Sequence, residues 1–106
     1  MIYGNKFSSK NKEPLTREEQ LKKNFYDIHY RLCAEYNEYN SNARAALNYK
    51  DKSNARYYYE KALSVAEKMM SNYDEYIDRG MKPNSAENQI SIKIRITKRD
   101  IEKCDE

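Results

Sequence analysis

The side chains best suited to chemistry in this sequence are one imidazole and one thiol, four residues apart. His29 is the only histidine of the 106-residue chain, and Cys33 is one of two cysteines, the other being Cys104. On a helix this spacing places both groups on one face, where they could share a metal ion or act as a nucleophile and its base. A zinc site needs more ligands, however, and the sequence has no second pair such as CxxC or HxxxH. We therefore predict a structural role for His29 and Cys33, no metal or cofactor, and no enzymatic activity.

A second candidate site is the basic segment KIRITKR at residues 93–99. This segment could contact the phosphates of a nucleic acid through four cations with no acid among them: Lys93, Arg95, Lys98 and Arg99. Four acidic residues follow directly, so the chain from Gly80 onward carries a net charge of only +1, and the whole chain only +3. A nucleic-acid-binding accessory protein is therefore the alternative hypothesis rather than the leading one.

Tyrosine is the third feature with functional meaning, because the chain contains 11 of them. Most fall at positions expected to face a core, but Tyr57 points away from the apolar stripe of its helix. Exposed aromatic side chains are enriched at protein interfaces, where they provide large contact area at low entropic cost. Tyr57 is thus the first candidate for a protein-binding residue.

The clearest structural element is an amphipathic helix predicted over residues 54–80. At 100° per residue, one stripe collects Ala55, Tyr59, Ala62, Ala66, Met69, Tyr73 and Ile77. Ser53 is expected to cap its N-terminus, and Gly80 to end it in a left-handed conformation with Pro83 shortly after. This helix is expected to be the one around which the others pack.

A longer helix is predicted before it. Thr16 and Glu19 form a capping box, so this helix begins at Arg17, and its apolar positions recur to about Tyr49: Leu21, Phe25, Ile28, Leu32, Tyr36, Tyr39, Ala43 and Ala46. An unbroken helix of this length would extend beyond its partner, so either an overhang or a break at residues 40–42 follows. The short segment at residues 48–52 forces the two helices into an antiparallel hairpin.

The C-terminal segment can be interpreted in two ways. Asn84 and Glu87 resemble a capping box, and helical spacing continues through Ile90, Ile94, Thr97, Ile101 and Cys104. Residues 89–96 also alternate between Ile and polar residues as a strand does. We favour a helix, with Ile92 and Ile96 facing a second neighbour. It is expected to cover the weaker apolar surface of the first helix, formed by Tyr26, Tyr30 and Cys33.

These elements predict an all-α fold: a small three-helix bundle built on a long antiparallel hairpin. Two Gly and two Pro leave few turns, which argues against a many-stranded sheet. We divide the chain into an N-terminal arm at residues 1–15, in which Ile2, Tyr3 and Phe7 could dock on the body, and one helical domain at residues 16–106. No signal peptide or membrane span is predicted, which indicates a cytoplasmic protein. The abundance of Lys, Asn, Tyr and Ile fits a low-GC bacterium or its phages and mobile elements.

The spacing of Ala55, Tyr59 and Ala62 resembles the second helix of a tetratricopeptide repeat. The resemblance covers about fifteen residues and departs from the family pattern at Asn42 and at Glu67. It implies close helix packing, mildly favours protein binding, and transfers no functional residue. Our leading hypothesis is a non-enzymatic domain that binds another protein, as an inhibitor, an immunity protein or an assembly subunit, with self-association as a further expectation.

Overall fold

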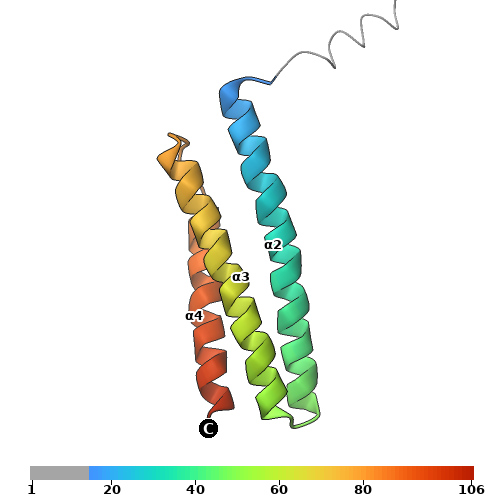
Figure 1. Ribbon diagram of the computed structural model, residues 1–106. Helices are drawn as coiled ribbons and strands as arrows, with labels where there is room; N and C mark the ends of the chain where they lie inside the picture. The colour runs from blue at the N-terminus through green and yellow to red at the C-terminus, as the bar shows by residue number, and fades with distance from the viewer. Residues whose placement is uncertain (1–14) are drawn as a thin grey trace, which may run out of the picture.

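The computed structural model describes residues 15–106, which form three helices and no strand (Figure 1). Helix α2 spans Arg17–Asn48, α3 spans Lys52–Asp78 and α4 spans Ala86–Cys104. The predicted all-α class and the antiparallel hairpin of α2 and α3 are confirmed, and so is the helical interpretation of the C-terminal segment. The expected arm lies, except for Leu15, outside the described residues.

The helix boundaries follow from local capping, with one correction. Thr16 and Glu19 form the predicted capping box, in which each side chain accepts a hydrogen bond from the other residue's backbone N–H. The prediction that Ser53 caps the next helix is wrong, because Asp51 does so, accepting from the Asn54 N–H at 3.1 Å. Asp51 follows a residue with φ of 60°, Lys50, and this left-handed turn brings its carboxylate to the helix end.

Helix α3 ends as predicted. Gly80 has φ of +92°, a conformation that an L side chain adopts only with strain, and its N–H donates to the Ile77 carbonyl. Helix α2, by contrast, does not break at residues 40–42. It runs for 32 residues, compared with 27 for α3. Of the two alternatives that the sequence left open, a break or an overhang, the structure therefore contains the overhang.

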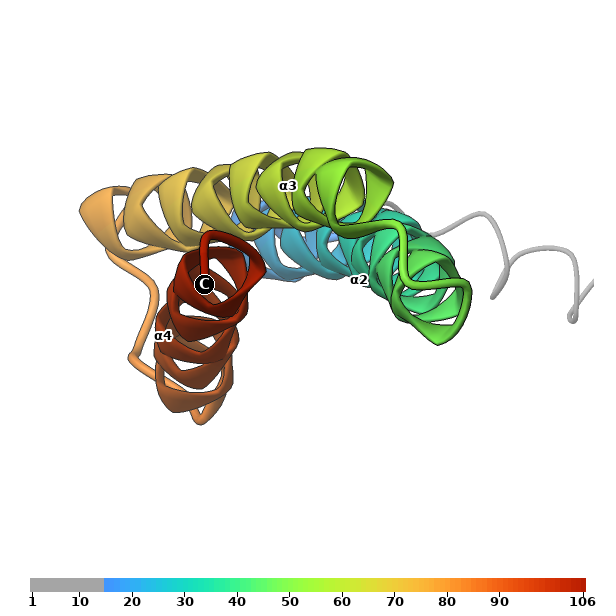
Figure 2. The same ribbon diagram turned by 90° about the horizontal axis from the view of Figure 1, so that it is seen from below.

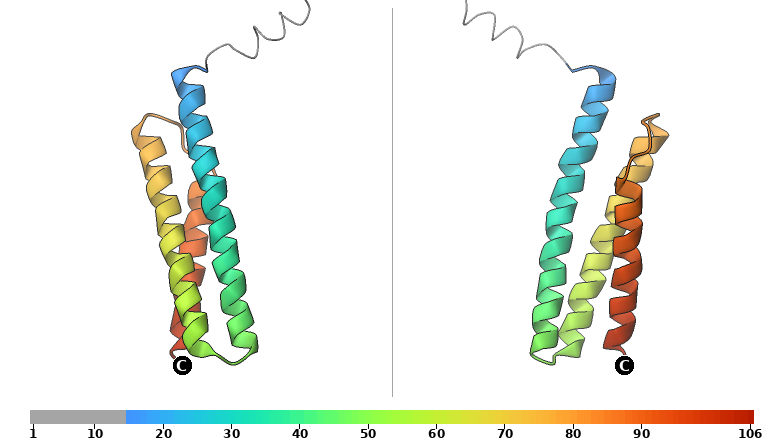
Figure 3. Two further views of the ribbon diagram at one scale, coloured as in Figure 1. Left: turned by 45° about the vertical axis from the view of Figure 1, so that its right-hand side comes forward. Right: turned by 180° about the vertical axis from the view of Figure 1, so that it is seen from behind.

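Helix α3 lies between the other two (Figures 2 and 3). It packs along α2 on one side and along α4 on another, whereas no Cα atom of α4 comes within 8 Å of one in α2 among the described residues. Figure 1 and the right view of Figure 3 also show α2 and α3 separating from each other with distance from their connecting turn. The two helices are therefore closest at the turn. We call the other, wider end of the hairpin its open end, where rings such as Phe25 and Tyr76 fill the space between the backbones.

The core is built from small residues and aromatic rings. Ala43, Ala55, Ala62 and Ala66 are completely buried, so the helix backbones approach closely at these positions. The remaining space in the main cluster is filled by larger side chains: Phe25, Leu32, Tyr36, Val65, Met69, Tyr73, Tyr76 and Ile90. The predicted stripe of α3 is thus buried except for half-buried Ile77, and Val65 joins it from a flanking position.

Helix α4 starts with a different cap from the one the sequence suggested. Ser85 occupies the N-cap position without a side-chain hydrogen bond, and the Asn84–Glu87 box does not form. The Asn84 carboxamide oxygen instead accepts from the Ala86 N–H at 2.8 Å, two residues on. The Asn84 backbone N–H donates a hydrogen bond to the Tyr73 hydroxyl, and the Asn84 side-chain amide donates one to the Tyr26 hydroxyl. Asn84 therefore connects the loop to both α3 and α2.

Among the described residues, α4 contacts α2 through side chains rather than by close approach of the two backbones. The Thr97 hydroxyl donates to the Lys93 carbonyl, so the Tyr36 hydroxyl must donate the buried 2.8 Å hydrogen bond that joins it to Thr97. The expectation that this segment covers Tyr26, Tyr30 and Cys33 is met in part. Tyr26 and Cys33 are half-buried, but Tyr30 is 65% exposed because α4 packs primarily on α3. Ile92 and Ile96 are exposed on α4, and no described helix covers them.

Ala62→Asp should strongly destabilise the fold, because it buries an unpaired carboxylate where α3 packs most closely. We expect a loss of more than about 3 kcal/mol in the free energy of unfolding, measured by urea denaturation followed by circular dichroism. Ser64→Asp, an identical charge at an exposed position of the same helix, serves as the control and should change stability by less than about 0.5 kcal/mol. Equal effects of the two substitutions would mean that α3 is rotated about its axis relative to this structure.

Candidate functional site

The structure brings His29 and Cys33 together, as their spacing predicts. The Cys33 sulfur lies 3.6 Å from Nε2 of His29, and the imidazole stacks on Phe25 at a centroid distance of 5.3 Å. His29 is 6% exposed, and its Nδ1 has no hydrogen-bond partner in the described part of the chain. Whichever tautomer pairs with the thiol, one buried ring nitrogen is left without a partner.

The electrostatics of this pair oppose nucleophilic catalysis. Burial lowers the pKa of His29, and the nearby Lys93 ammonium lowers it further. Burial also raises the pKa of Cys33, more than Lys93 lowers it. An activated Cys–His pair needs a stabilised thiolate and a basic imidazole, and both shifts run in the opposite direction. The arrangement favours a neutral thiol beside a neutral ring, which fits the structural role predicted for the two residues.

The structure also provides no metal centre around this pair. Within residues 15–106, no three His, Cys, Asp or Glu side chains are grouped so that they could hold an ion. Cys33 and Cys104 are both free thiols.

None of the three described helices is long and apolar enough to cross a bilayer.

The four basic residues of the KIRITKR segment do not share one surface. Arg95, Lys98 and Arg99 are exposed on the outer side of α4. Lys93 is half-buried, and its ammonium nitrogen lies 5.7 Å from the centroid of the Tyr36 ring on α2. Lys93 and Arg95 are two residues apart on a helix, so about 200° separates their directions. A phosphate backbone running along the outer side of α4 would therefore meet three of these cations.

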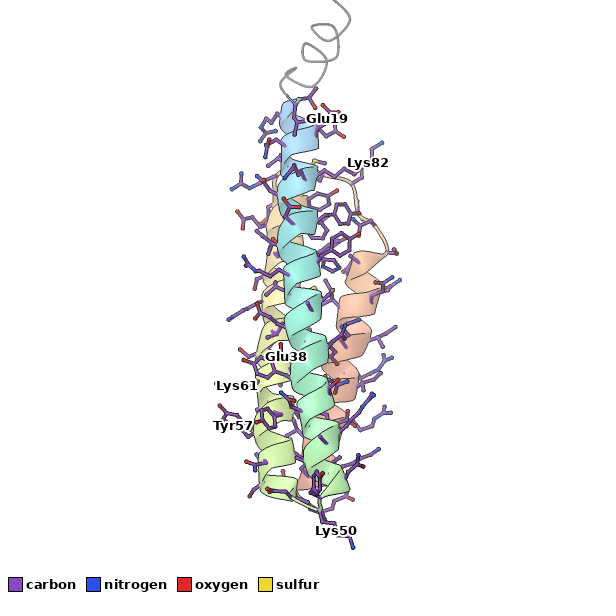
Figure 4. The ribbon with its side chains drawn as sticks, turned by 90° about the vertical axis from the view of Figure 1, so that its right-hand side faces the viewer. Glu19, Glu38, Lys50, Tyr57, Lys61 and Lys82 are labelled. Carbon is purple, nitrogen blue, oxygen red and sulfur yellow. The ribbon has the colours of Figure 1, made fainter. Side chains whose placement is uncertain are left out.

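Tyr57 is exposed, as predicted, and lies on the side of the hairpin away from α4. Figure 4 shows it beside Lys61 on α3, with Glu38 of α2 on the same side. The ring is 52% exposed, lies 5.4 Å from the Lys61 ammonium nitrogen, and meets Tyr58 edge-on at 5.3 Å between centroids. The Tyr57 ring therefore lies on an accessible surface, with Lys61 and Tyr58 packed beside it.

A feature that the sequence analysis missed lies on this same side. A groove of about 300 Å³ opens between α2 and α3 at the open end of the hairpin, and we call it the end groove. No residue of α4 lines it, and its main lining residues are Leu21, Phe25, Ile28, Asn72, Glu75 and Tyr76. Glu75 follows Tyr57 by eighteen residues, about five helical turns, so the two share one side of α3 about 27 Å apart. We call this uncovered side of the hairpin, from Tyr57 to the end groove, the open face.

No protein-family model, curated protein or solved structure matches this chain. Residues 15–106 form a three-helix domain in which a long hairpin has one face covered by α4 and one open face.

His29 should make the stability of the fold depend on pH. The unfolded chain protonates His29 near its ordinary pKa of 6.5, whereas the folded chain protonates it only at lower pH. The unfolded state then binds more protons between these two values. The free energy of unfolding should fall as the pH drops below about 6.5, and His29 should contribute no pH dependence above that range.

Urea denaturation from about pH 8 to about pH 5, compared with His29→Gln, isolates this effect, because the variant cannot take up a proton at this position. The groups around the imidazole are Lys93 on α4 and Cys33, Tyr26 and Tyr30 on α2. A variant whose stability falls as steeply with acid as the parent's would assign the pH dependence to other residues.

Proposed function

We propose that this protein is a non-enzymatic domain that binds another protein through the open face of its hairpin. The observation that carries this proposal is that no helix within residues 15–106 covers that face. Helix α4 packs on the other side of α3, while Tyr57 and the end groove remain accessible. A role as inhibitor, immunity protein or assembly subunit would each use such a surface.

The chemistry of the open face supports a protein partner. Tyr57 offers a half-exposed aromatic ring with a cation beside it, and the end groove offers an apolar floor between polar rims. Interfaces commonly combine a few aromatic anchors with a polar surround. The charges on this face are of both signs, as Glu38 and Lys61 illustrate in Figure 4, so the face has no strong preference for a polyanion.

The alternative is nucleic-acid binding by α4. Its supporting observation is the exposure of Arg95, Lys98 and Arg99 on one helix, whereas Lys93 lies apart from them beside the Tyr36 ring. Each phosphate that a cation neutralises contributes about −0.9 to the slope of log affinity against log salt, so three contacts would give a slope near −2.7. Apolar contacts on the open face respond far less to salt, which separates the two functions experimentally.

The test uses the immobilised full chain to capture proteins from an extract of the organism that makes it. We expect a discrete protein to be retained from about 0.1 to about 0.5 M salt, identified by mass spectrometry, and lost with Tyr57→Ser. Tyr49→Ser is the matched control, since Tyr49 is an exposed tyrosine in the turn between α2 and α3. Loss with both variants, or with neither, would remove Tyr57 from the proposed interface.

The same preparation tests the alternative with labelled duplex DNA and single-stranded RNA by fluorescence anisotropy. Tight binding with a slope near −2.7, abolished when Arg95, Lys98 and Arg99 are replaced by Gln, would replace the leading proposal by the alternative. Weak binding that the Gln variant retains would eliminate specific use of α4.

A further inference from the structure

The end groove is shaped for apolar side chains rather than for a charged ligand. Its floor is formed by Leu21, Phe25, Ile28 and Tyr76, and Ile28 remains 36% exposed. The charged groups at its rim already have partners: Glu75 pairs with Arg79 at 2.9 Å, and Asp27 pairs with Lys23 at 2.8 Å. A small charged ligand would have to compete with these pairs, whereas an apolar side chain would cover the floor without disturbing them.

The location of the end groove points to an occupant within the same chain. Leu21 lies only six residues after Leu15, where the described structure begins, so about 9 Å of helix separates them, and Ile28 is about 20 Å from Leu15. Fourteen further residues precede Leu15, and they include Ile2, Tyr3 and Phe7. The eight residue steps between Phe7 and Leu15 can span up to about 27 Å, which exceeds the distance of about 20 Å from Leu15 to Ile28.

Charge also favours this occupant. Residues 1–14 carry three lysines and one glutamate, a net charge of +2. The two helix segments that border the groove, residues 17–28 and 72–80, carry six carboxylates against four cations, a net charge of −2. Opposite net charges a few residues apart along the chain raise the local concentration of the segment at the groove.

We propose that residues 1–14 of this chain bind in the end groove, with the Phe7 ring on the floor beside Ile28. The segment then covers one end of the open face and leaves Tyr57 free. This inference concerns a contact within a single chain, so its test does not require the proposed partner. The partner is then left with the part of the open face around Tyr57.

A double-mutant cycle in the full chain tests the contact. Phe7→Ala should lower the equilibrium constant of folding by about 5-fold to 30-fold, and in an Ile28→Ala background the same substitution should lower it by less than about 2-fold. Leu47→Ala is the matched control background, because Leu47 is similarly exposed but lies near the turn at the other end of α2. There Phe7→Ala should keep its full effect.

Two results would overturn the proposal. An effect of Phe7→Ala that is equally large in the Ile28→Ala and Leu47→Ala backgrounds would place Phe7 elsewhere, and the absence of any effect would show that the ring is not docked. The cycle is repeated at about tenfold higher protein concentration, where an intramolecular contact gives the same coupling. Coupling that grows with concentration would instead mean that the segment binds the groove of a second copy.

Discussion

The structure depends on the ability of α3 to pack closely against two neighbours at once. Its completely buried alanines, Ala55, Ala62 and Ala66, remove side-chain volume where the other helices approach. Because α2 and α4 have no close backbone contact with each other among the described residues, they are joined through α3 and through side-chain contacts such as the Tyr36–Thr97 hydrogen bond. The open face is a direct result, since α4 is the only described helix beside the hairpin of α2 and α3 and packs on one side of it.

Tyrosine replaces aliphatic residues in much of this core, and the replacement shapes the surface as well as the interior. Tyr36, Tyr73 and Tyr76 bury their rings, and the hydroxyls of Tyr36 and Tyr73 find partners in Thr97 and Asn84. These hydrogen bonds fix α4 and its loop at defined positions over α3. Hydrogen bonds require a defined geometry, so these tyrosines restrict how the helices can be placed at the edge of the core. Leucine side chains would impose no such restriction.

Much of the fold could be predicted from the sequence because the information is local. Apolar periodicity located the buried stripe of α3, and the Thr16–Glu19 box and Gly80 marked two helix ends. The capping errors arose where two polar residues competed for one position: Asp51 caps α3 because Lys50 adopts a left-handed turn, which no sequence pattern indicated. The continuity of α2 through residues 40–42 was undecided because packing of Ala43 against α3 outweighs the weak helix propensity of Asn and Ser.

The features of the candidate sites also divide into those that the sequence could predict and those that it could not. The exposure of Tyr57 follows from helical phase alone, and the sequence predicted it correctly. The separation of Lys93 from the other three cations follows from the same geometry, but it is not evident when the four basic residues are considered together as one short segment. The end groove could not be predicted, because it exists only where α2 and α3 separate, and this depends on side chains from both helices, such as Phe25 and Tyr76.

The central role of α3 can be measured directly by native-state hydrogen exchange resolved along the chain. If both neighbours pack on α3, its amides from Ala62 to Tyr73 should exchange most slowly, near the rate set by global unfolding, and those of α4 should exchange faster through local detachment. Slowest exchange in α2 or α4, or equal protection in all three helices with α4 fully protected, would contradict an architecture in which α3 holds the domain together.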